Sequence, residues 1–204
     1  MNVNGRRTQA ERTAATRAAL VGAGRELFGR DGYAGVGTQA IVERAGVTRG
    51  ALYHQFDDKR GLFTAVFDEL EQDVARFCAD AAAELVDADP VAALKAGIRA
   101  FLEYFHDPAA QTIGLVDAPA VLGWAAWRAR GEEFGFALVE SLLAAAMEAG
   151  QIIPGPTRPM AHVALGALDE SALFVAAAED SATATAQVTA ILDRIVDSFT
   201  TEKG

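Results

Sequence analysis

Side chains with long hydrogen-bond donors gather between residues 37 and 60, together with small residues that leave room around them. In the major groove of DNA, Arg49 could donate to the O6 and N7 atoms of one guanine, and Gln39 could pair with adenine. Gly50 would let a helix approach bases or phosphates without steric obstruction. Each residue taken singly is more often solvated surface or packing, so only their combination points to nucleic-acid contact.

Two short helices joined by a glycine-containing turn must position these side chains. The sequence predicts one helix over residues 38–45 that ends at Gly46, and a second over residues 49–55 with Thr48 as its N-cap. Apolar side chains can hold this pair against the preceding helix, namely Ile41, Ala45, Val47, Leu52 and Phe56. The arrangement is a helix-turn-helix, a motif that is by itself common in all-α proteins.

Charge divides the chain into two parts. The 204 residues carry a net charge of −10, which taken whole argues against a nucleic-acid binder, because phosphate contacts need lysine and arginine. Residues 1–60, however, hold ten basic and six acidic residues, a net charge of +4, whereas residues 61–204 carry −14. The opposite signs indicate two functions and predict a domain over residues 1–60 and another over residues 61–204.

Several other classes of protein are disfavoured by the composition. Cys78 is the only cysteine, so a disulfide within the chain and a multi-cysteine metal site are excluded, and His106 and His162 are too isolated to indicate a metal. No apolar run approaches the roughly 18 residues of a membrane span, and the N-terminus lacks an apolar signal segment, so we expect a soluble cytoplasmic protein. The sequence shows no nucleophile–histidine–acid arrangement, so we expect no enzyme and no cofactor.

Helix dominates the predicted fold. Alanine fills 44 positions, alternating strand-like runs are nearly absent, and all six prolines lie at or after Pro90. The predicted class is therefore all-α, with an N-terminal helix-turn-helix and a C-terminal helical domain. About nine helices are expected, at residues 8–30, 38–45, 49–55, 58–87 and 90–106, one short helix and a bend within 107–123, and then 124–149 (in one or two pieces around Gly131), 159–179 and 183–199.

Residues 20–67 resemble the N-terminal domain of the TetR (tetracycline repressor-like) transcriptional regulators. The matching residues are Gly32-Tyr33, Ile41, Ala45-Gly46-Val47-Thr48, Gly50, Leu52-Tyr53, Phe56, Lys59 and Leu62. The chain departs from the family pattern at Gln55, where histidine is usual, and at Gly37, where serine or threonine often caps the helix. Gln55 can still donate to a phosphate, although without a charge.

The resemblance implies a homodimeric repressor of a palindromic double-stranded DNA operator, released by a small-molecule effector. The second helix of each motif would enter the major groove, with half-sites roughly 34–36 Å apart. An arginine pair ahead of the first helix looks like a basic arm, and helix starts suit phosphates. The predicted DNA contacts are Arg6, Arg7, Gly37, Thr38, Gln39, Thr48, Arg49, Gly50, Tyr53, His54, Gln55 and Lys59.

The resemblance also implies an effector pocket and a dimer interface in the acidic part. Apolar ligand sites are lined by aromatic side chains with a few polar groups, and the candidates are Phe67, Phe77, Phe101, Tyr104, Phe105, Asp117, Trp124, Trp127 and Arg128. The last two helices would form the dimer interface through Leu165, Leu168, Ala172, Val175, Val188, Ile191, Leu192 and Ile195. A helical sensor acting through a protein partner, or an all-α enzyme, remains as an alternative.

Overall fold

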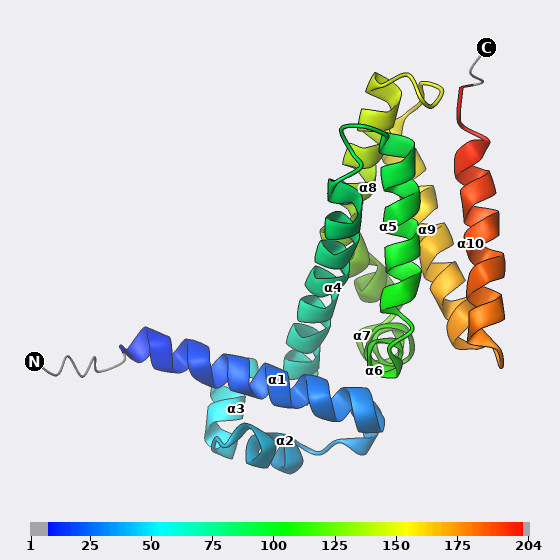
Figure 1. Cartoon of the computed structure of the whole chain (residues 1–204). Helices are drawn as coiled ribbons and strands as arrows, with labels where there is room; N and C mark the ends of the chain where they lie inside the picture. The colour runs from blue at the N-terminus through cyan, green and yellow to red at the C-terminus, as the bar shows by residue number, and fades with distance from the viewer. Residues whose placement is uncertain (1–7, 202–204) are drawn as a thin grey trace, which may run out of the picture.

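The computed structural model describes residues 8–201, and these residues form a helical molecule (Figure 1). The elements are α1 (Gln9–Gly35), α2 (Thr38–Ala45), α3 (Arg49–Phe56), α4 (Lys59–Ala83), α5 (Pro90–Tyr104), α6 (Pro108–Ala110), the π-helical segment η1 (Gln111–Asp117), α7 (Ala118–Leu122), α8 (Trp124–Glu148), α9 (Thr157–Ala176) and α10 (Ser181–Asp197). Because α6, η1 and α7 follow one another without a break, the described residues carry nine helical units, which confirms the predicted class.

Local sequence signals account for most helix ends. Thr8 forms a capping box with Glu11 at the start of α1. Gly32 interrupts α1 with a φ of 72°, so the first helix continues through a kink to Gly35 instead of ending near residue 30 as predicted. Asp58 caps α4 by accepting a hydrogen bond from the N–H of Gly61 at 2.7 Å. α2 and α3 begin where the sequence predicts.

Two segments differ from the prediction. Residues 108–122 are helical throughout: Pro108 begins α6, where the missing N–H of proline removes no helical hydrogen bond, and Pro119 lies in the first turn of α7, just after the π-helical segment. The π-helical segment between them places the backbone of Gly114 against the Phe105 ring, where a Cβ would lie 2.9 Å from a ring carbon. α4 ends at Ala83 rather than near Asp87. α8 is a single helix through Gly131, which is one of the two predicted possibilities.

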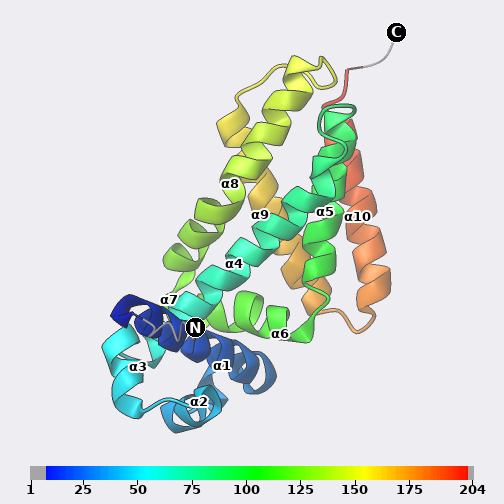
Figure 2. The same ribbon diagram turned by 60° about the vertical axis from the view of Figure 1, so that its left-hand side comes forward.

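The helices form two groups that meet at α1. In Figure 1, α1 crosses the lower end of α4, with α2 and α3 beneath it, while α4, α5, α8, α9 and α10 stand together as a bundle. Figure 2 shows α6 and α7 at the base of this bundle, next to α1. One buried apolar cluster runs from α1–α3 through α4 to α8. A second lies among α4, α5, α8 and α9 at the far end of the bundle, and a third joins α5, α9 and α10.

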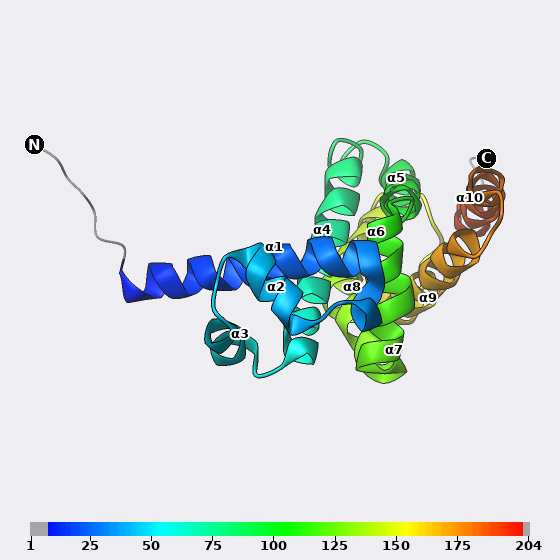
Figure 3. The same cartoon turned by 90° about the horizontal axis from the view of Figure 1, so that it is seen from below.

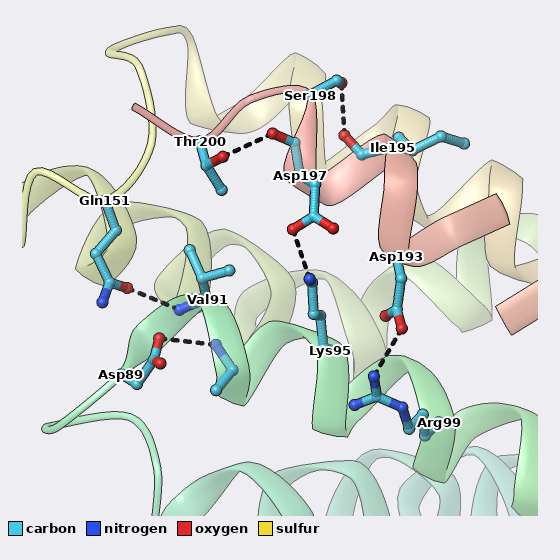
Figure 4. A network of polar contacts seen from close by, with 11 residues as sticks. Asp89, Val91, Lys95, Arg99, Gln151, Asp193, Ile195, Asp197, Ser198 and Thr200 are labelled. Atoms are coloured by element: carbon cyan, nitrogen blue, oxygen red, sulfur yellow. Dashed lines mark hydrogen bonds and ion pairs between the residues drawn. The ribbon is translucent and has the colours of Figure 1, made fainter. Parts of the chain in front are cut away.

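Ion pairs add to a buried apolar cluster in attaching α10 to α5 (Figure 4). Lys95 pairs with Asp197 at 2.5 Å, and Arg99 pairs with Asp193 at 2.7 Å. After α10 the chain also pairs with the loop that follows α8, where the N–H of Ile153 donates to the carbonyl of Phe199 at 2.8 Å. Within residues 8–201, no helix combines the length and the hydropathy required to cross a membrane.

Candidate nucleic-acid interface and ligand cavity

Buried apolar side chains and two turn residues fix the angle between α2 and α3. Ile41 on α2 and Leu52 on α3 have no exposed surface. Gly46 ends α2 with a φ of 65°, a left-handed conformation that glycine adopts without strain. Thr48 caps α3 by accepting a hydrogen bond from the N–H of Ala51 at 3.2 Å. The predicted helix-turn-helix is therefore present, with its predicted apolar residues facing α1.

α3 presents a stacked pair of side chains to solvent. Arg49 donates a hydrogen bond to the phenolic oxygen of Tyr53 at 3.3 Å, and its guanidinium carbon lies 5.6 Å from the centre of the ring. Hydrogen bonds with Arg49 and Thr38 lower the pKa of Tyr53. Since Thr38 is the first residue of α2, these three side chains join the outer surfaces of both helices. Such a group can contact phosphates and base edges together.

Most of the predicted DNA-contact residues lie exposed on α2 and α3, at the end of the molecule seen in Figure 3. The exposed ones are Gly37, Gln39, Thr48, Arg49, Gly50, Tyr53 and His54, whereas Thr38, Gln55 and Lys59 are half-buried. Gly37 caps α2 without a side-chain hydrogen bond, so the first N–H groups of this helix remain available to an anion. Arg6 and Arg7 lie outside the described residues.

Lys59 has a structural position that the sequence did not indicate. Its ammonium group donates to the carbonyls of Tyr33 and Val36, each at 2.9 Å, and lies 4.0 Å from the centre of the Tyr33 ring. These carbonyls belong to the end of α1, where a cation satisfies acceptors that lack helical partners. Lys59 thus links α4 to α1, and its predicted phosphate contact stays a prediction.

A cavity of about 370 Å³ lies among α4, α5, α8, α9 and α10. Its wall is almost wholly apolar and includes Val74, Leu94, Ile98, Phe101, Leu138, Leu142, Met160, Leu165, Leu168 and Leu192. Gly131 and Gly135 on α8 face it without side chains, which leaves room between α8 and the other helices. This volume and this lining are typical of a site for a small organic molecule.

The charged side chains of the cavity wall gather at one end of it. Arg128 on α8 pairs with Asp169 on α9 at 2.6 Å and with Glu132 at 3.7 Å. Glu71 on α4 lies at the same end, beside Gly131, and has no hydrogen bond or ion pair with any described residue. Burial raises the pKa of Glu71 to about 8, and the nearby Asp169 adds to this shift. Burial also raises the pKa of Asp169, to about 6.

The aromatic residues predicted to line the effector site are divided among several surroundings. Phe101 and Arg128 line the cavity, and Phe105 and Trp127 line a small hollow that adjoins its charged end. Phe67 is fully buried in the core, and Tyr104 accepts a hydrogen bond from Arg25. Phe77 and Trp124 are 41% and 61% exposed, respectively, so neither side chain is enclosed by the bundle.

Sequence reasoning missed most of the cavity wall. Glu71, Glu132 and Asp169 were not among the candidates, and neither was Cys78, whose thiol pKa burial raises to about 12. The available signal was an acidic residue directly after an apolar one, as in Leu70-Glu71 and Leu168-Asp169. That signal is weak, because acidic residues occur throughout the predicted helices and only the packing of three helices shows which ones are enclosed.

The predicted dimer residues are mostly buried within the single chain. Leu165, Leu168, Ala172, Val175, Val188 and Leu192 are buried, whereas Ile191 and Ile195 are 57% and 47% exposed. Val163 and Phe174 on α9 are also exposed, at 74% and 55%. Val163 and Ile195 also line the cavity, whereas Phe174 on α9 and Ile191 on α10 lie outside it and leave large apolar side chains exposed among the described residues.

Two protein-family sequence models match the chain. The family described as "Bacterial regulatory proteins, tetR family" matches residues 20–66, and "Tetracyclin repressor-like, C-terminal domain" matches residues 91–199, which is more than half of the chain. The chain belongs to the TetR family of transcriptional regulators. The family and the fold are those of transcriptional regulators, as the sequence predicted.

Individual relatives agree with this family. The HTH-type transcriptional regulator CymR of Pseudomonas putida is 36% identical over 86 residues, 42% of each chain. The chain spans about half the length of the curated relatives it matches. A crystal structure of a TetR-family regulator from Pectobacterium atrosepticum, 29% identical, superposes with a TM-score of 0.83 over 96% of this chain and 99% of that one. RolR with resorcinol is 19% identical and has a TM-score of 0.72, over 92% of this chain and 90% of that one, so it shows the fold alone.

In this TetR-family chain, polar contacts join the cavity helices to α1. The side chain of Asp117, the last residue of η1, accepts a hydrogen bond from the N–H of Tyr33 at 2.6 Å. Arg25 on α1 pairs with Asp73 on α4 at 2.5 Å. A Cβ on Gly29 of α1 would lie 2.7 Å from that of Ala109, so α1 and α6 are in close contact. A shift of η1 would therefore act directly on α1.

The indole of Trp127 lies between the cavity and η1. Its Nε1–H donates to the carbonyl of Gly114 at 2.9 Å, and it neighbours Arg128 in the chain. Trp124 lies beside it, with ring centres 4.8 Å apart, but is largely exposed. The charged end of the cavity, Trp127 and η1 thus form a continuous series of contacts from the bundle to α1.

Proposed function

We propose that this TetR-family regulator is a cytoplasmic repressor that binds a palindromic operator as a homodimer and is released by a small-molecule effector. Residues 1–60 form the DNA-binding domain, and residues 61–204 bind the effector and dimerise. The observation that carries the proposal is the exposed Arg49–Tyr53 pair on α3 together with the cavity in the bundle.

Charge and exposure support DNA contact by α3 and by the start of α2. The first 60 residues carry +4 against −14 on the remainder, so a DNA duplex is attracted to the helix-turn-helix and repelled from the bundle. Arg49 reads a base edge, and the N–H groups that follow Gly37 hold a phosphate. Gln39, Thr48, Gly50, His54 and Gln55 complete the contact surface, together with Arg6 and Arg7 ahead of α1.

The cavity and its contacts with η1 support effector release. RolR was crystallised with resorcinol, so a fold of this kind can enclose a small organic molecule. In our proposal, an effector changes the position of α8 and η1, and the Asp117–Tyr33 hydrogen bond carries this change to α1. The effector releases DNA only to the extent that it binds the two arrangements with different affinities.

The exposed apolar residues of α9 and α10 support dimerisation. Ile191 on α10 and Phe174 on α9 leave large apolar surface in water, and patches of this kind mark protein–protein contacts. We propose that α9 and α10 of two subunits pack as a four-helix bundle around a two-fold axis, which matches the symmetry of a palindromic operator.

Genomic binding-site selection with the purified protein tests the proposal and supplies the operator. On that operator, Arg49→Ala is expected to weaken binding by roughly 1–3 kcal/mol and to relax the preference at one base pair. Arg76→Ala, which removes an exposed arginine on α4, is the charge-matched control and should leave affinity unchanged. Surface plasmon resonance at several salt concentrations measures both, and affinity should fall steeply as salt rises. Equal loss on operator and random DNA would make Arg49 a phosphate contact instead.

A further inference from the structure

The cavity has an unusual distribution of charge for a space lined by apolar side chains. Its charged residues are one arginine and three acids, and the acids come from three different places: Glu71 on α4, Glu132 on α8 and Asp169 on α9. All of them lie at the same end of the cavity, where Arg128 holds Glu132 and Asp169. At this end of the cavity, three acidic side chains therefore accompany one cationic side chain. Among the described residues, no charged side chain lines any other part of the cavity wall.

Glu71 is the one acid of this group without a partner. It has no hydrogen bond or ion pair within the described chain, and its half-buried side chain lines the cavity where α4 faces α8 and α9. A carboxyl group that faces an apolar cavity without a partner is poorly solvated in its charged form. An unsatisfied carboxyl at the wall of a cavity is stabilised by a ligand that supplies the missing contact.

The other charged groups around Glu71 are already engaged. On α4, Asp68 pairs with Arg130 of α8. Arg128 is shared between Asp169 and Glu132, and Glu132 also lies 3.3 Å from the imidazole of His162 on α9. The remaining titratable neighbour is Cys78 on α4, which lines the same cavity. Glu71 therefore faces an excess of negative charge with no free cation among the described residues.

We propose that this cavity binds an apolar molecule that carries a basic amine, with its ammonium group paired to Glu71 and its apolar part among α4, α5, α8, α9 and α10. The inference rests on the proposal that the cavity is the effector site and names the chemical class of that effector. An ammonium group supplies the donors that Glu71 lacks and offsets the acidic excess. A carboxylate ligand meets repulsion, because Arg128 is taken by two acids.

Proton release accompanies this binding. Near pH 7 the free protein holds Glu71 mostly as the neutral acid, since its pKa is about 8. When the ammonium ligand arrives, the Glu71 proton leaves to solvent and an ion pair forms between the ammonium nitrogen and the carboxylate oxygens. Amine affinity therefore rises with pH up to about 8, whereas a neutral ligand of the same shape shows no such rise.

Three ligands with the same phenyl ring and four-carbon chain test the class: phenylbutylamine, phenylbutanol and phenylbutyrate. Isothermal titration calorimetry on the full chain at pH 8 is expected to give at least tenfold tighter binding of the amine than of the alcohol, and weaker binding still of the carboxylate. Between pH 7.0 and 8.5 the amine affinity should rise about 5- to 10-fold, as linkage to a group of pKa near 8 requires. Titrations in two buffers of different ionisation enthalpy should report the released proton.

Glu71→Gln removes the charge and keeps the shape. It is expected to weaken amine binding at least tenfold, to abolish the pH dependence and to leave alcohol binding within twofold. Glu69→Gln, an exposed position on the same helix, is the matched control and should behave as the parent. A thermal melt of each variant verifies folding. Equal binding of amine and alcohol, tighter binding of the carboxylate, no amine binding, or full amine binding by Glu71→Gln would each overturn the inference.

Operator binding, measured separately by surface plasmon resonance, distinguishes this result from failure of the proposed function. If the protein binds its operator and the alcohol or the carboxylate releases it, repression by effector release stands and the amine assignment is wrong. If the amine binds with the expected pH dependence but no selected DNA is recognised, the cavity chemistry stands and the repressor proposal fails.

Discussion

Glu71 makes the stability of the protein depend on pH in the direction opposite to that of a typical paired carboxylate. Its folded-state pKa of about 8 lies above the ordinary value of 4.5, so the folded chain binds more protons than the unfolded chain between these two values. The stability that the protonated group contributes is complete below pH 4.5 and is lost as pH rises through 8. The slope from this group is about 1.4 kcal/mol per pH unit.

Glu71→Gln should remove this slope because glutamine does not titrate. The melting temperature of the variant is expected to equal that of the parent near pH 5 and to exceed it increasingly toward pH 8. Circular dichroism melts at four pH values measure the difference, in which the titrations of all other groups cancel. Glu69→Gln serves as the control and should track the parent. A difference that does not change with pH would show that Glu71 is charged in the folded protein.

The sequence predicts which side chains the helix-turn-helix exposes, but it does not predict the cavity. Arg49, Thr48 and Gly50 occupy one short helix, so a few consecutive letters determine their common exposure. Glu71 and Asp169 are 98 positions apart in the sequence, and only the packing of α4 against α8 and α9 brings them to one wall. The role of Lys59 at the end of α1 was missed for the same reason, since its acceptors lie more than 20 residues earlier.

At the scale of elements, caps and turns predict helix starts well. Thr48, Asp58 and Pro90 each mark a helix start that the structure contains. The continuous helical path within residues 107–123 was not predicted, because the prolines and the glycine of this segment were expected to interrupt the helix. Tertiary packing stabilises this helical path. Gly114 lets η1 pack directly against Phe105, and a side chain at position 114 would prevent this contact.

The contact of α1 with α6 can be tested with two glycines of the same helix. Gly29→Ala introduces a Cβ 2.7 Å from that of Ala109 and should lower the free energy of unfolding by about 1–3 kcal/mol. Gly22→Ala places its Cβ in open space and should raise it by about 0.5–1 kcal/mol, because alanine is the better helix former. Urea denaturation measures both. Shifts of the same sign would mean that helix propensity alone, and not contact with α6, governs α1.

The hydrogen bond between η1 and α1 can be removed at Asp117. Asp117→Ala deprives the N–H of Tyr33 of its acceptor and should reduce stability by about 1–2 kcal/mol. It should also speed amide hydrogen exchange of the residues around Tyr33, as mass spectrometry of the exchanged protein can follow. Asp107→Ala is the matched control, since Asp107 caps α6 and has no hydrogen bond with α1. Unchanged exchange at Tyr33 in the Asp117 variant would contradict the proposed transmission.

At the scale of the whole molecule, the exposed apolar face of α9 and α10 should decide the oligomeric state. Ile191→Glu puts a charge at the centre of the proposed two-fold interface, opposite its own symmetry mate, and is expected to weaken dimerisation at least tenfold. Sedimentation equilibrium across a concentration series measures the shift. Ala186→Glu adds the same charge to an exposed position on the opposite side of α10 and serves as the control. A dimer unaffected by Ile191→Glu would place the interface elsewhere.

The two tryptophans have an optical consequence. They are the only indoles in the chain, and they lie side by side where α8 begins, one buried and hydrogen-bonded to the carbonyl of Gly114, the other largely in water. Tryptophan fluorescence therefore combines a blue-shifted component from buried Trp127 and a red-shifted component from exposed Trp124, both at the start of α8. Any movement of α8 relative to η1 changes the polarity around Trp127 and therefore shifts the wavelength of maximum tryptophan emission. The protein carries its own fluorescent reporter near the point where the bundle meets α1.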